Sequence, residues 1–226
     1  MSDSDQTYDF KSFWLTNLPT RNLFLIILIV YIILSIFNII RVDVTNLRDV
    51  FTISVDLLAI VGQNNLRVFN GHIYLILTSI FVHSNIIHFI SNCLFLFIFG
   101  LRAEERFFSW QYYTIFIVSG LLGGILSFVF GPYSISVGAS GGIFGLLGAD
   151  LILAYEENKR KSLWAHLGAG VIFLAITGGV NVNSLAHGIG LLSGIVLPYF
   201  FLKRRKTEGR GKSDNSLNLT QKNRKA

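Results

Sequence analysis

Long apolar runs separated by short polar segments dominate the chain. Six runs are candidates for membrane spans, at residues 23–40, 86–100, 112–130, 140–155, 167–180 and 185–202. A helix needs about 20 mainly apolar residues to cross hydrocarbon, and helices satisfy their own backbone groups there. The pattern therefore predicts an all-α polytopic membrane helix bundle of six transmembrane helices, in which the glycine-rich run at 167–180 is the weakest.

Residues 41–85 break this pattern. Charged residues flank or interrupt two apolar stretches, at 57–61 and 73–82, and the second is too short to span comfortably. Short amphipathic helices lying in the headgroup region suit such a segment. We expect a first loop that is partly embedded in the membrane.

The polar segments set the domain boundaries. Residues 1–22 form a polar N-terminal segment, residues 23–202 the membrane domain, and residues 203–226 a basic tail that is predicted to be disordered. A signal-peptide core has about 7–15 apolar residues and a small-residue cleavage site. The first run is longer and shows no such site, so we expect it to be retained.

Composition supports a membrane protein. The chain is 52% hydrophobic and 14% charged, whereas a soluble domain carries about 25% charged residues. Its single cysteine, Cys93, excludes an intramolecular disulfide. The net charge of +6 lies mostly in the tail and short loops. This placement favours contact with anionic lipid and predicts no nucleic-acid partner.

Lysine and arginine placement predicts the orientation. One side would hold Lys11, Arg21, Arg102, Arg106, residues 159–161 and residues 203–206. The opposite short loops, at 131–137 and 181–184, contain no lysine or arginine, although Arg41, Arg48 and Arg67 in the first loop oppose the assignment. The positive-inside rule places both termini in the cytoplasm. Ser140 and His187 then start their helices at the same extracytoplasmic face.

Ser140 is the first candidate for chemistry. It begins an apolar run between Gly138 and Gly141, and Gly141, Gly145 and Gly148 recur along one helical stripe. Such a stripe lets a second helix approach closely. The alternative is that Ser140 simply caps the helix N-terminus.

His187 is the second candidate. Gly190 and Gly194 share its helical face, which would pack on the stripe that follows Ser140. Close approach would bring a serine oxygen within hydrogen-bond reach of an imidazole, the geometry of an activated nucleophile. A histidine in a span is costly, so bonding to another buried polar group is the alternative.

A third cluster contains His83, His88 and Asn92. His88 and Asn92 are four residues apart on one helical face, and both can donate hydrogen bonds to a developing oxyanion. Polar contact between helices is the alternative. The spacing of His83 and His88 would place them on different helical faces without a carboxylate ligand, which argues against a metal site.

Three motifs in this order resemble the rhomboid family of intramembrane serine proteases. They are His88-x-x-x-Asn92, Gly138-x-Ser140-Gly141 and Ala186-His187-x-x-Gly190-x-x-x-Gly194, and the resemblance covers roughly residues 71–200. It implies a Ser140 nucleophile with His187 as its general base. It also implies an oxyanion hole formed by His88, Asn92 and the Ser140 backbone N–H.

The resemblance implies further properties. Gly138, Gly141, Phe144, Gly190 and Gly194 would pack around the site or contact substrate, and the fifth span would be a mobile gate. Glu104-x-Arg106 matches a pattern that stabilises the loop after the second span. Substrates would be transmembrane segments of membrane proteins, cleaved without cofactor or metal. We expect a polar cavity bounded by Ser140, His187, His88 and Asn92.

Some positions depart from the family pattern. Tyr74 and Leu75 stand where Trp-Arg is frequent, Phe144 where some members have tyrosine, and Ser184 where asparagine is common. Asp150 lies inside the fourth span, about 15 Å from Ser140 along a helix. It has no role in the predicted chemistry beyond a buried polar partner or a place near the cytoplasmic interface.

Three functions are compatible with a chain of this kind. The first is an active serine endopeptidase in the plasma membrane, with the lipid bilayer and transmembrane proteins as its partners. The second is a catalytically silent relative that binds transmembrane clients; such relatives usually lack the serine or the histidine. The third, a transporter or channel, would need charged or repeated elements along a pathway. The pattern specifies no oligomeric state.

Overall fold

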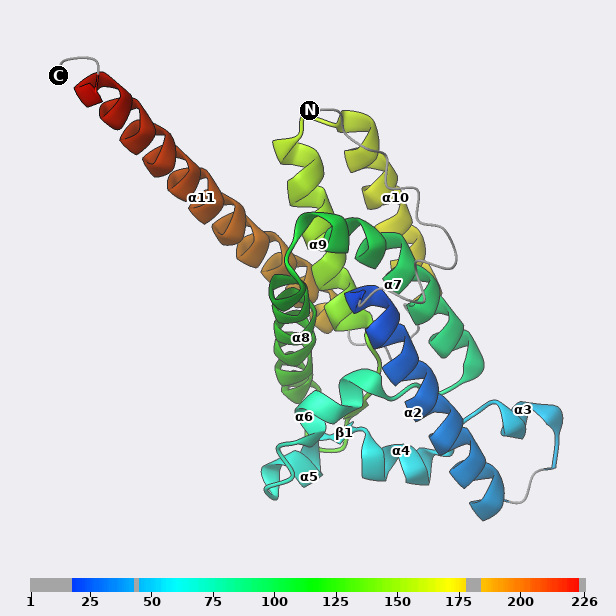
Figure 1. Ribbon diagram of the computed structural model, residues 1–226. Helices are drawn as coiled ribbons and strands as arrows, with labels where there is room; N and C mark the ends of the chain where they lie inside the picture. Colours follow the sequence, from blue (N-terminus) through cyan, green and yellow to red (C-terminus); the bar gives the residue numbers. More distant parts are fainter. Residues whose placement is uncertain (1–17, 43–44, 178–183, 224–226) are drawn as a thin grey trace.

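The computed structural model describes residues 18–42, 45–177 and 184–223, with the backbone alone for residue 206 and residues 208–223. The predicted N-terminal segment therefore lies largely outside the described residues. The long helices are α2 (Pro19–Arg41), α7 (Ile86–Arg106), α8 (Ser109–Leu126), α9 (Ser140–Glu156), α10 (Arg160–Thr177) and α11 (Ser184–Asn223). They pack into one bundle, from which the C-terminal part of α11 projects (Figure 1).

Four of these helices are long and apolar enough to cross a membrane. They are α2, α7, α8 with its 3-10 extension η2 (Ser127–Phe130), and α11 as far as Arg205. The all-α polytopic membrane bundle predicted from the sequence is thereby confirmed. Helices α9 and α10 do not meet this standard of length and apolar character. Helix α9 has 17 residues, and α10 begins with Arg160 and Lys161. The count of six spans stays a prediction.

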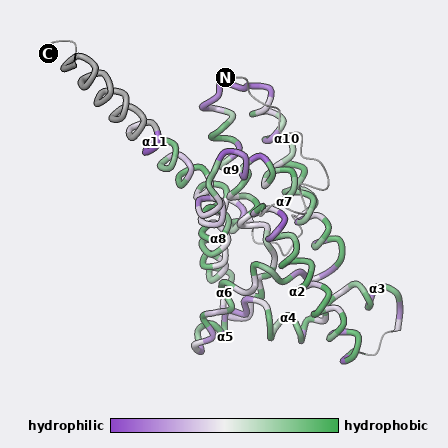
Figure 2. Tube along the Cα trace, viewed as in Figure 1, coloured by the Kyte–Doolittle hydropathy of each residue, from purple (hydrophilic) through white to green (hydrophobic). Residues whose placement is uncertain are grey.

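Helix α9 is the centre of the bundle. It packs against α7, α8, α10 and α11, and 13 of its 17 residues are buried. A helix that is apolar on every side belongs in a protein interior. Figure 2 shows the apolar character of the long helices, with hydrophilic residues around the turn between α9 and α10.

Glycines bring α9 and α11 into backbone contact. A Cβ atom at Gly190 would overlap the carbonyl oxygen of Gly141, and one at Gly194 would overlap that of Gly145. A Cβ at Gly148 would lie 2.5 Å from the Leu191 carbonyl oxygen. The two glycine stripes thus face each other, and only glycine permits this approach.

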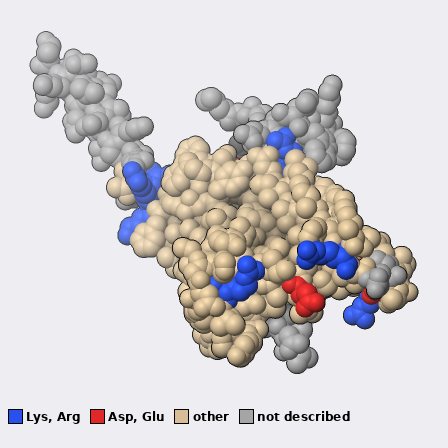
Figure 3. All heavy atoms as spheres, turned by 90° about the horizontal axis from the view of Figure 1, so that it is seen from below, with Lys and Arg blue, Asp and Glu red and all other residues tan. Residues whose placement is uncertain are grey.

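The first loop folds into short elements at one end of the bundle (Figure 1). They are α3 (Leu47–Val50), α4 (Val55–Val61), β1 (Gln63–Asn64), α5 (Asn65–Phe69), α6 (Leu75–Thr78) and the 3-10 turn η1 (Ser79–Phe81). Strand β1 pairs antiparallel with β2 (Ile135–Ser136). Two residues are too few for an alternating pattern, so the sequence did not predict this pair. Figure 3 shows this end, where few charged side chains interrupt the surface.

Two boundaries differ from the predicted ones. Helix α2 begins at Pro19 rather than residue 23, because proline suits the first turn of a helix. Helix α11 continues to Asn223, whereas residues 203–226 were predicted to be disordered. A helix already nucleated in the bundle can extend through lysine and arginine, which are good helix formers.

Charged residues join the helices at the other end. Glu157, at the end of α9, pairs with Arg102 at 3.6 Å, with Lys159 at 2.8 Å and with Arg106. Burial acts to raise the pKa of Glu157, but the Lys159 hydrogen bond and the nearby cationic charges hold it below its ordinary value. The Glu104 carboxylate accepts a hydrogen bond from the Thr20 backbone N–H at 3.0 Å. These contacts tie α7 to α2 and to the α9–α10 turn.

Candidate active site

Local backbone geometry places Ser140 at the start of α9. Gly138 has φ +116°, a left-handed conformation that favours glycine, and a Cβ there would lie 2.7 Å from the His88 ring. Ala139 is the N-cap residue. Ser140 is therefore not the cap, and its backbone N–H lies in the first turn, where helices leave donors free.

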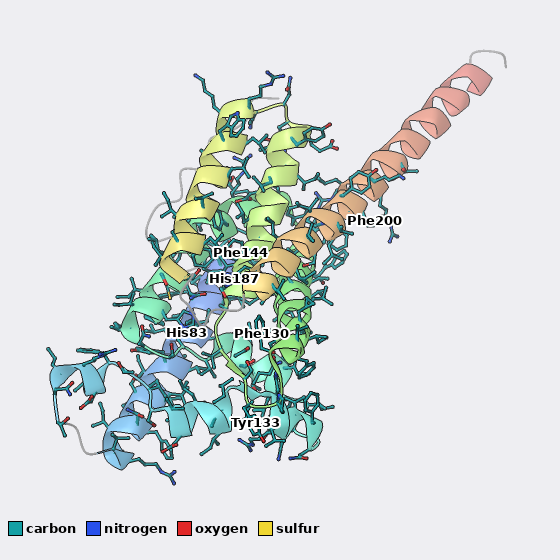
Figure 4. All side chains as sticks on the ribbon, turned by 180° about the vertical axis from the view of Figure 1, so that it is seen from behind. His83, Phe130, Tyr133, Phe144, His187 and Phe200 are labelled. Carbon is teal, nitrogen blue, oxygen red and sulfur yellow. The ribbon has the colours of Figure 1, made fainter. Side chains whose placement is uncertain are left out.

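His187 lies in the first turn of α11, facing Ser140. Its Nε2 is 2.9 Å from the Ser140 Oγ, and the residue is 4% exposed. Among the described residues the His187 Nδ1 has no hydrogen-bond partner. The Phe144 ring stacks on the imidazole, with centroids 4.7 Å apart and planes 24° from parallel. Figure 4 shows the two rings side by side.

A helix cap positions His88. The Asn85 side-chain oxygen accepts a hydrogen bond from the His88 backbone N–H at 2.9 Å and so fixes the start of α7. The His88 Nδ1 lies 3.2 Å from the Ser84 hydroxyl oxygen. The His88 ring also lies against Gly138, in the loop that leads to Ser140.

Asn92 lies away from the cavity. It is fully buried, and its Nδ2 donates to the His88 carbonyl oxygen at 2.8 Å. Asn92 is not among the residues that line the cavity beside Ser140, and one of its amide hydrogens bonds back to its own helix. Whether it donates directly to substrate stays a prediction.

His83 is fully buried and precedes α7 rather than lying on it. Its ring centroid is 5.0 Å from that of His88, so the argument that the two point to different helical faces was wrong. Burial, with a contribution from His88, lowers the pKa of His83 to about 3. Within the described residues, no group of three or more His, Cys, Asp or Glu side chains could hold a metal ion.

A cavity of about 930 Å³ opens beside the serine and the histidine. Ser140, His187 and His88 line it together with first-loop residues, the β2 segment, and Ile176 and Thr177 of α10. Phe130 and Tyr133 also line the cavity, and Figure 4 shows them toward the first-loop end. The cavity thus reaches from the Ser140–His187 pair to the first loop.

Gln63 is fully buried on the cavity wall and was not among the site residues predicted from the sequence. Its Nε2 donates to the Gly124 carbonyl oxygen at 2.7 Å and to the Ser127 hydroxyl at 2.6 Å. Asn65 donates to the carbonyl oxygens of Ser127 at 3.0 Å and Gly131 at 2.8 Å. These bonds fasten the first loop to α8 and η2. In the sequence, the run of amide side chains after Gly62 is the only sign of these hydrogen bonds.

Comparison with known protein families matches residues 70–204 to the Rhomboid domain. The chain belongs to the rhomboid family. Rhomboid membership and the apolar helices together make it an integral, multi-pass membrane protein.

Individual relatives include both a protease and an inactive protein. The chain is 38% identical over 132 residues to RHOMBOID-like protein 6, mitochondrial, of Arabidopsis thaliana. It is 34% identical over 144 residues to Rhomboid protease GluP of Bacillus subtilis (strain 168), and 32% over 135 residues to Inactive rhomboid protein 2 of Homo sapiens. These matches cover 56%, 61% and 57% of this rhomboid.

The same matches cover 43%, 28% and 16% of the relatives, so the chain spans less than half the length of each. Family membership supports an intramembrane protease or a rhomboid-like function.

Proposed function

We propose that this rhomboid is a serine endopeptidase that hydrolyses peptide bonds in or near transmembrane segments of membrane proteins. The observation that carries the proposal is the 2.9 Å distance between Ser140 Oγ and His187 Nε2 at the wall of a large cavity. A serine within hydrogen-bond reach of a histidine is the arrangement of an activated nucleophile. The likeness to Rhomboid protease GluP supports the same reaction class.

The pair supports a two-step acyl transfer. His187 Nε2 takes the hydroxyl proton as Ser140 Oγ bonds to the scissile carbonyl carbon, and returns it to the leaving amine. Water then attacks the acyl carbon and gives a proton to the same nitrogen; the bond between that carbon and Ser140 Oγ breaks as the proton returns to Oγ. This use of Nε2 requires hydrogen on Nδ1. Stacking on Phe144 orients the ring, a task that aspartate performs in a catalytic triad.

Two donors suit the developing oxyanion. The Ser140 backbone N–H is free of the helix, and the His88 ring lines the cavity beside Gly138. Asn92 stabilises the oxyanion in one of two ways. It donates its second amide hydrogen to the oxyanion, or it positions His88 through its hydrogen bond to the His88 carbonyl oxygen. The reaction uses no cofactor or metal.

A catalytically silent, client-binding protein is the second candidate, because Inactive rhomboid protein 2 is also a relative. Such a protein needs the cavity but not an activated serine. The two proposals therefore differ in the reactivity of Ser140.

The test is labelling by a fluorophosphonate probe in detergent. Wild type should label, and Ser140→Ala and His187→Ala should not. Ser193→Ala is the matched control, because Ser193 also lies on α11 and donates to the Ser119 hydroxyl at 2.8 Å, away from His187. It should label like wild type.

Size-exclusion profiles show whether each variant is folded. If monodisperse wild type fails to label, the protease proposal is wrong and the client-binding proposal is favoured. Equal labelling of wild type and Ser140→Ala would assign the reactive serine elsewhere.

A further inference from the structure

The α8–α9 loop, residues 131–139, leads directly to the candidate nucleophile. It follows η2, contains β2 and ends at Ser140. Gly138 in this loop lies against the His88 ring, and Ala139 is the N-cap residue of α9. The path of the loop therefore sets where the Ser140 backbone N–H lies relative to the His88 ring, the two donors proposed for the oxyanion.

The first loop holds the backbone of the α8–α9 loop. Strand β1 of the first loop pairs with β2. The Asn65 backbone N–H donates to the Ser134 carbonyl oxygen at 3.1 Å. The Leu66 backbone N–H donates to the Pro132 carbonyl oxygen at 2.8 Å. The first half of the α8–α9 loop is thus bonded to residues that follow α4 in the chain.

A second attachment lies closer to Ser140. The Gly138 backbone N–H donates to the Ser79 carbonyl oxygen at 3.0 Å, so the turn η1 holds the residue that lies beside His88. Gly62, just before β1, is so close to the α8–α9 loop that a Cβ atom there would lie 2.6 Å from the Val137 Cγ1. First-loop residues therefore contact the α8–α9 loop along most of its length.

Two buried amide side chains complete this attachment. Asn65 and Gln63 are both fully buried. The Asn65 Nδ2 donates to the carbonyl oxygens of Ser127, at the start of η2, and Gly131, just after its end. The Gln63 Nε2 donates to the Gly124 carbonyl oxygen on α8. Carbonyl oxygens only accept hydrogen bonds, so both positions require a donor side chain.

The amide pair supplies a register that the two strands lack. Strands β1 and β2 pair through two residues each, and so short a ladder does not fix its own register. A slip by one residue would move the loop by about 3.3 Å and turn its side chains to the opposite face. Asn65 opposes this slip, because its amide binds the carbonyl oxygens on both sides of η2, where the α8–α9 loop begins.

We propose that Gln63 and Asn65 are positioning residues for Ser140. They hold the α8–α9 loop in the register that places Gly138 against the His88 ring and directs the start of α9. The effect on catalysis rests on the proposed protease function, whereas the placement of the loop does not. Asn65 then influences the rate of acyl transfer without contact with substrate.

Asn65 is the better of the two residues for a test. Gln63 lines the cavity, whereas Asn65 does not, so a change at Asn65 reaches the reaction only through the loop that it holds. The matched control is the preceding residue, Asn64. Its side-chain oxygen accepts a hydrogen bond from the Arg67 backbone N–H and caps α5 within the first loop.

Hydrogen exchange of the full chain in detergent measures the placement of the loop. In Asn65→Ala we expect amide exchange in residues 131–139 to be about tenfold faster than in wild type, because local opening of the loop becomes more frequent. Asn64→Ala should exchange like wild type in this segment. If Asn65→Ala is not monodisperse, Asn65→Ser, which retains one shorter donor, takes its place under the same criteria.

Fluorophosphonate labelling of the same samples measures the effect on Ser140. The labelled fraction at the end point counts folded molecules, whereas the maximal rate constant reports on the geometry of those that are folded. A displacement of reacting groups by about 1 Å can cost about 100-fold in rate. We expect Asn65→Ala to lower the maximal rate about 10- to 100-fold at an unchanged half-saturating probe concentration, and Asn64→Ala to label like wild type.

A wild-type labelling rate in Asn65→Ala would overturn the proposal. An equal loss of rate in Asn64→Ala would do the same, since it would reflect general loosening of the first loop. If wild type does not label while Asn65→Ala still speeds exchange in residues 131–139, the protease proposal fails and the placement of the loop by Asn65 stands. Unchanged exchange in that segment would reject the placement itself.

Discussion

Single residues set the geometry around Ser140. Gly138 can adopt its backbone conformation beside the His88 ring because it has no side chain, and Asn85 caps α7 so that His88 follows in its first turn. Ala139 occupies the N-cap position, so the Ser140 side chain is not used to cap α9. Each side chain of the candidate site therefore depends on a neighbour that has no chemical role of its own.

His88 and Asn92 should differ in their effects on catalysis. His88 lines the cavity, whereas the Asn92 amide bonds to the His88 carbonyl oxygen and lies off the wall. Loss of a direct oxyanion donor costs about 10²–10³-fold in kcat. We expect His88→Ala to fall in this range and Asn92→Ala to lose clearly less, measured as the fluorophosphonate labelling rate. A larger loss for Asn92→Ala would make Asn92 the direct donor.

At the scale of elements, the contact between α9 and α11 brings Ser140 and His187 together. Ser140 and His187 lie on different helices, 47 residues apart in sequence. Their side chains meet because Gly190 and Gly194 let the two backbones touch. The ion pairs of Glu157 lie toward the other end of α9, as do the contacts of Asp150 with Arg102 and His166. They join α9 to α7 and α10.

Two glycines of α11 provide a matched test of this contact. A methyl group at Gly190 would overlap the Gly141 carbonyl oxygen, whereas one at Gly188 would meet open space. Overpacking costs about 1–3 kcal/mol, which lowers Tm by about 2–4 °C per kcal/mol in a protein of this size. Gly190→Ala should lower Tm and slow serine labelling, and Gly188→Ala should change neither. Equal Tm values would show that the helices do not meet as described.

At the scale of the whole molecule, the bundle has two unlike ends. Arg102, Arg106, Glu157 and Lys159 gather at one end, and the first loop with the β1–β2 pair closes the other. The cavity lies toward the first-loop end. From the positive-inside rule we predict that the cavity faces the extracytoplasmic side.

Cysteine accessibility in intact cells tests this orientation. In a Cys93→Ser background, Tyr133→Cys should react with a membrane-impermeant maleimide, because Tyr133 is 84% exposed in the loop between α8 and α9. Arg160→Cys, exposed at the start of α10, should react only after the cells are opened. The reverse result would invert the orientation and place the Ser140–His187 pair toward the cytoplasm.

Periodicity made much of the candidate site predictable. Ser140 and His187 each start an apolar run and each precede glycines on one helical face, so local spacing alone suggested their meeting. The Phe144 ring beside His187 was implied by the resemblance to the family and not by spacing. The positions of Asn92 and His83 could not be predicted, because the rotation of an amide and the path of a loop depend on contacts distant in sequence.

The sequence by itself determined the apolar helices, the glycine faces and the residues that meet across them, because these follow from hydrophobicity and the helical repeat. Only the tertiary structure decided that Gln63 fastens the first loop to α8, and that Asp150 lies between Arg102 and His166. These contacts join residues on separate elements. They depend on how each helix is rotated and where each loop runs, and packing of the whole bundle sets both.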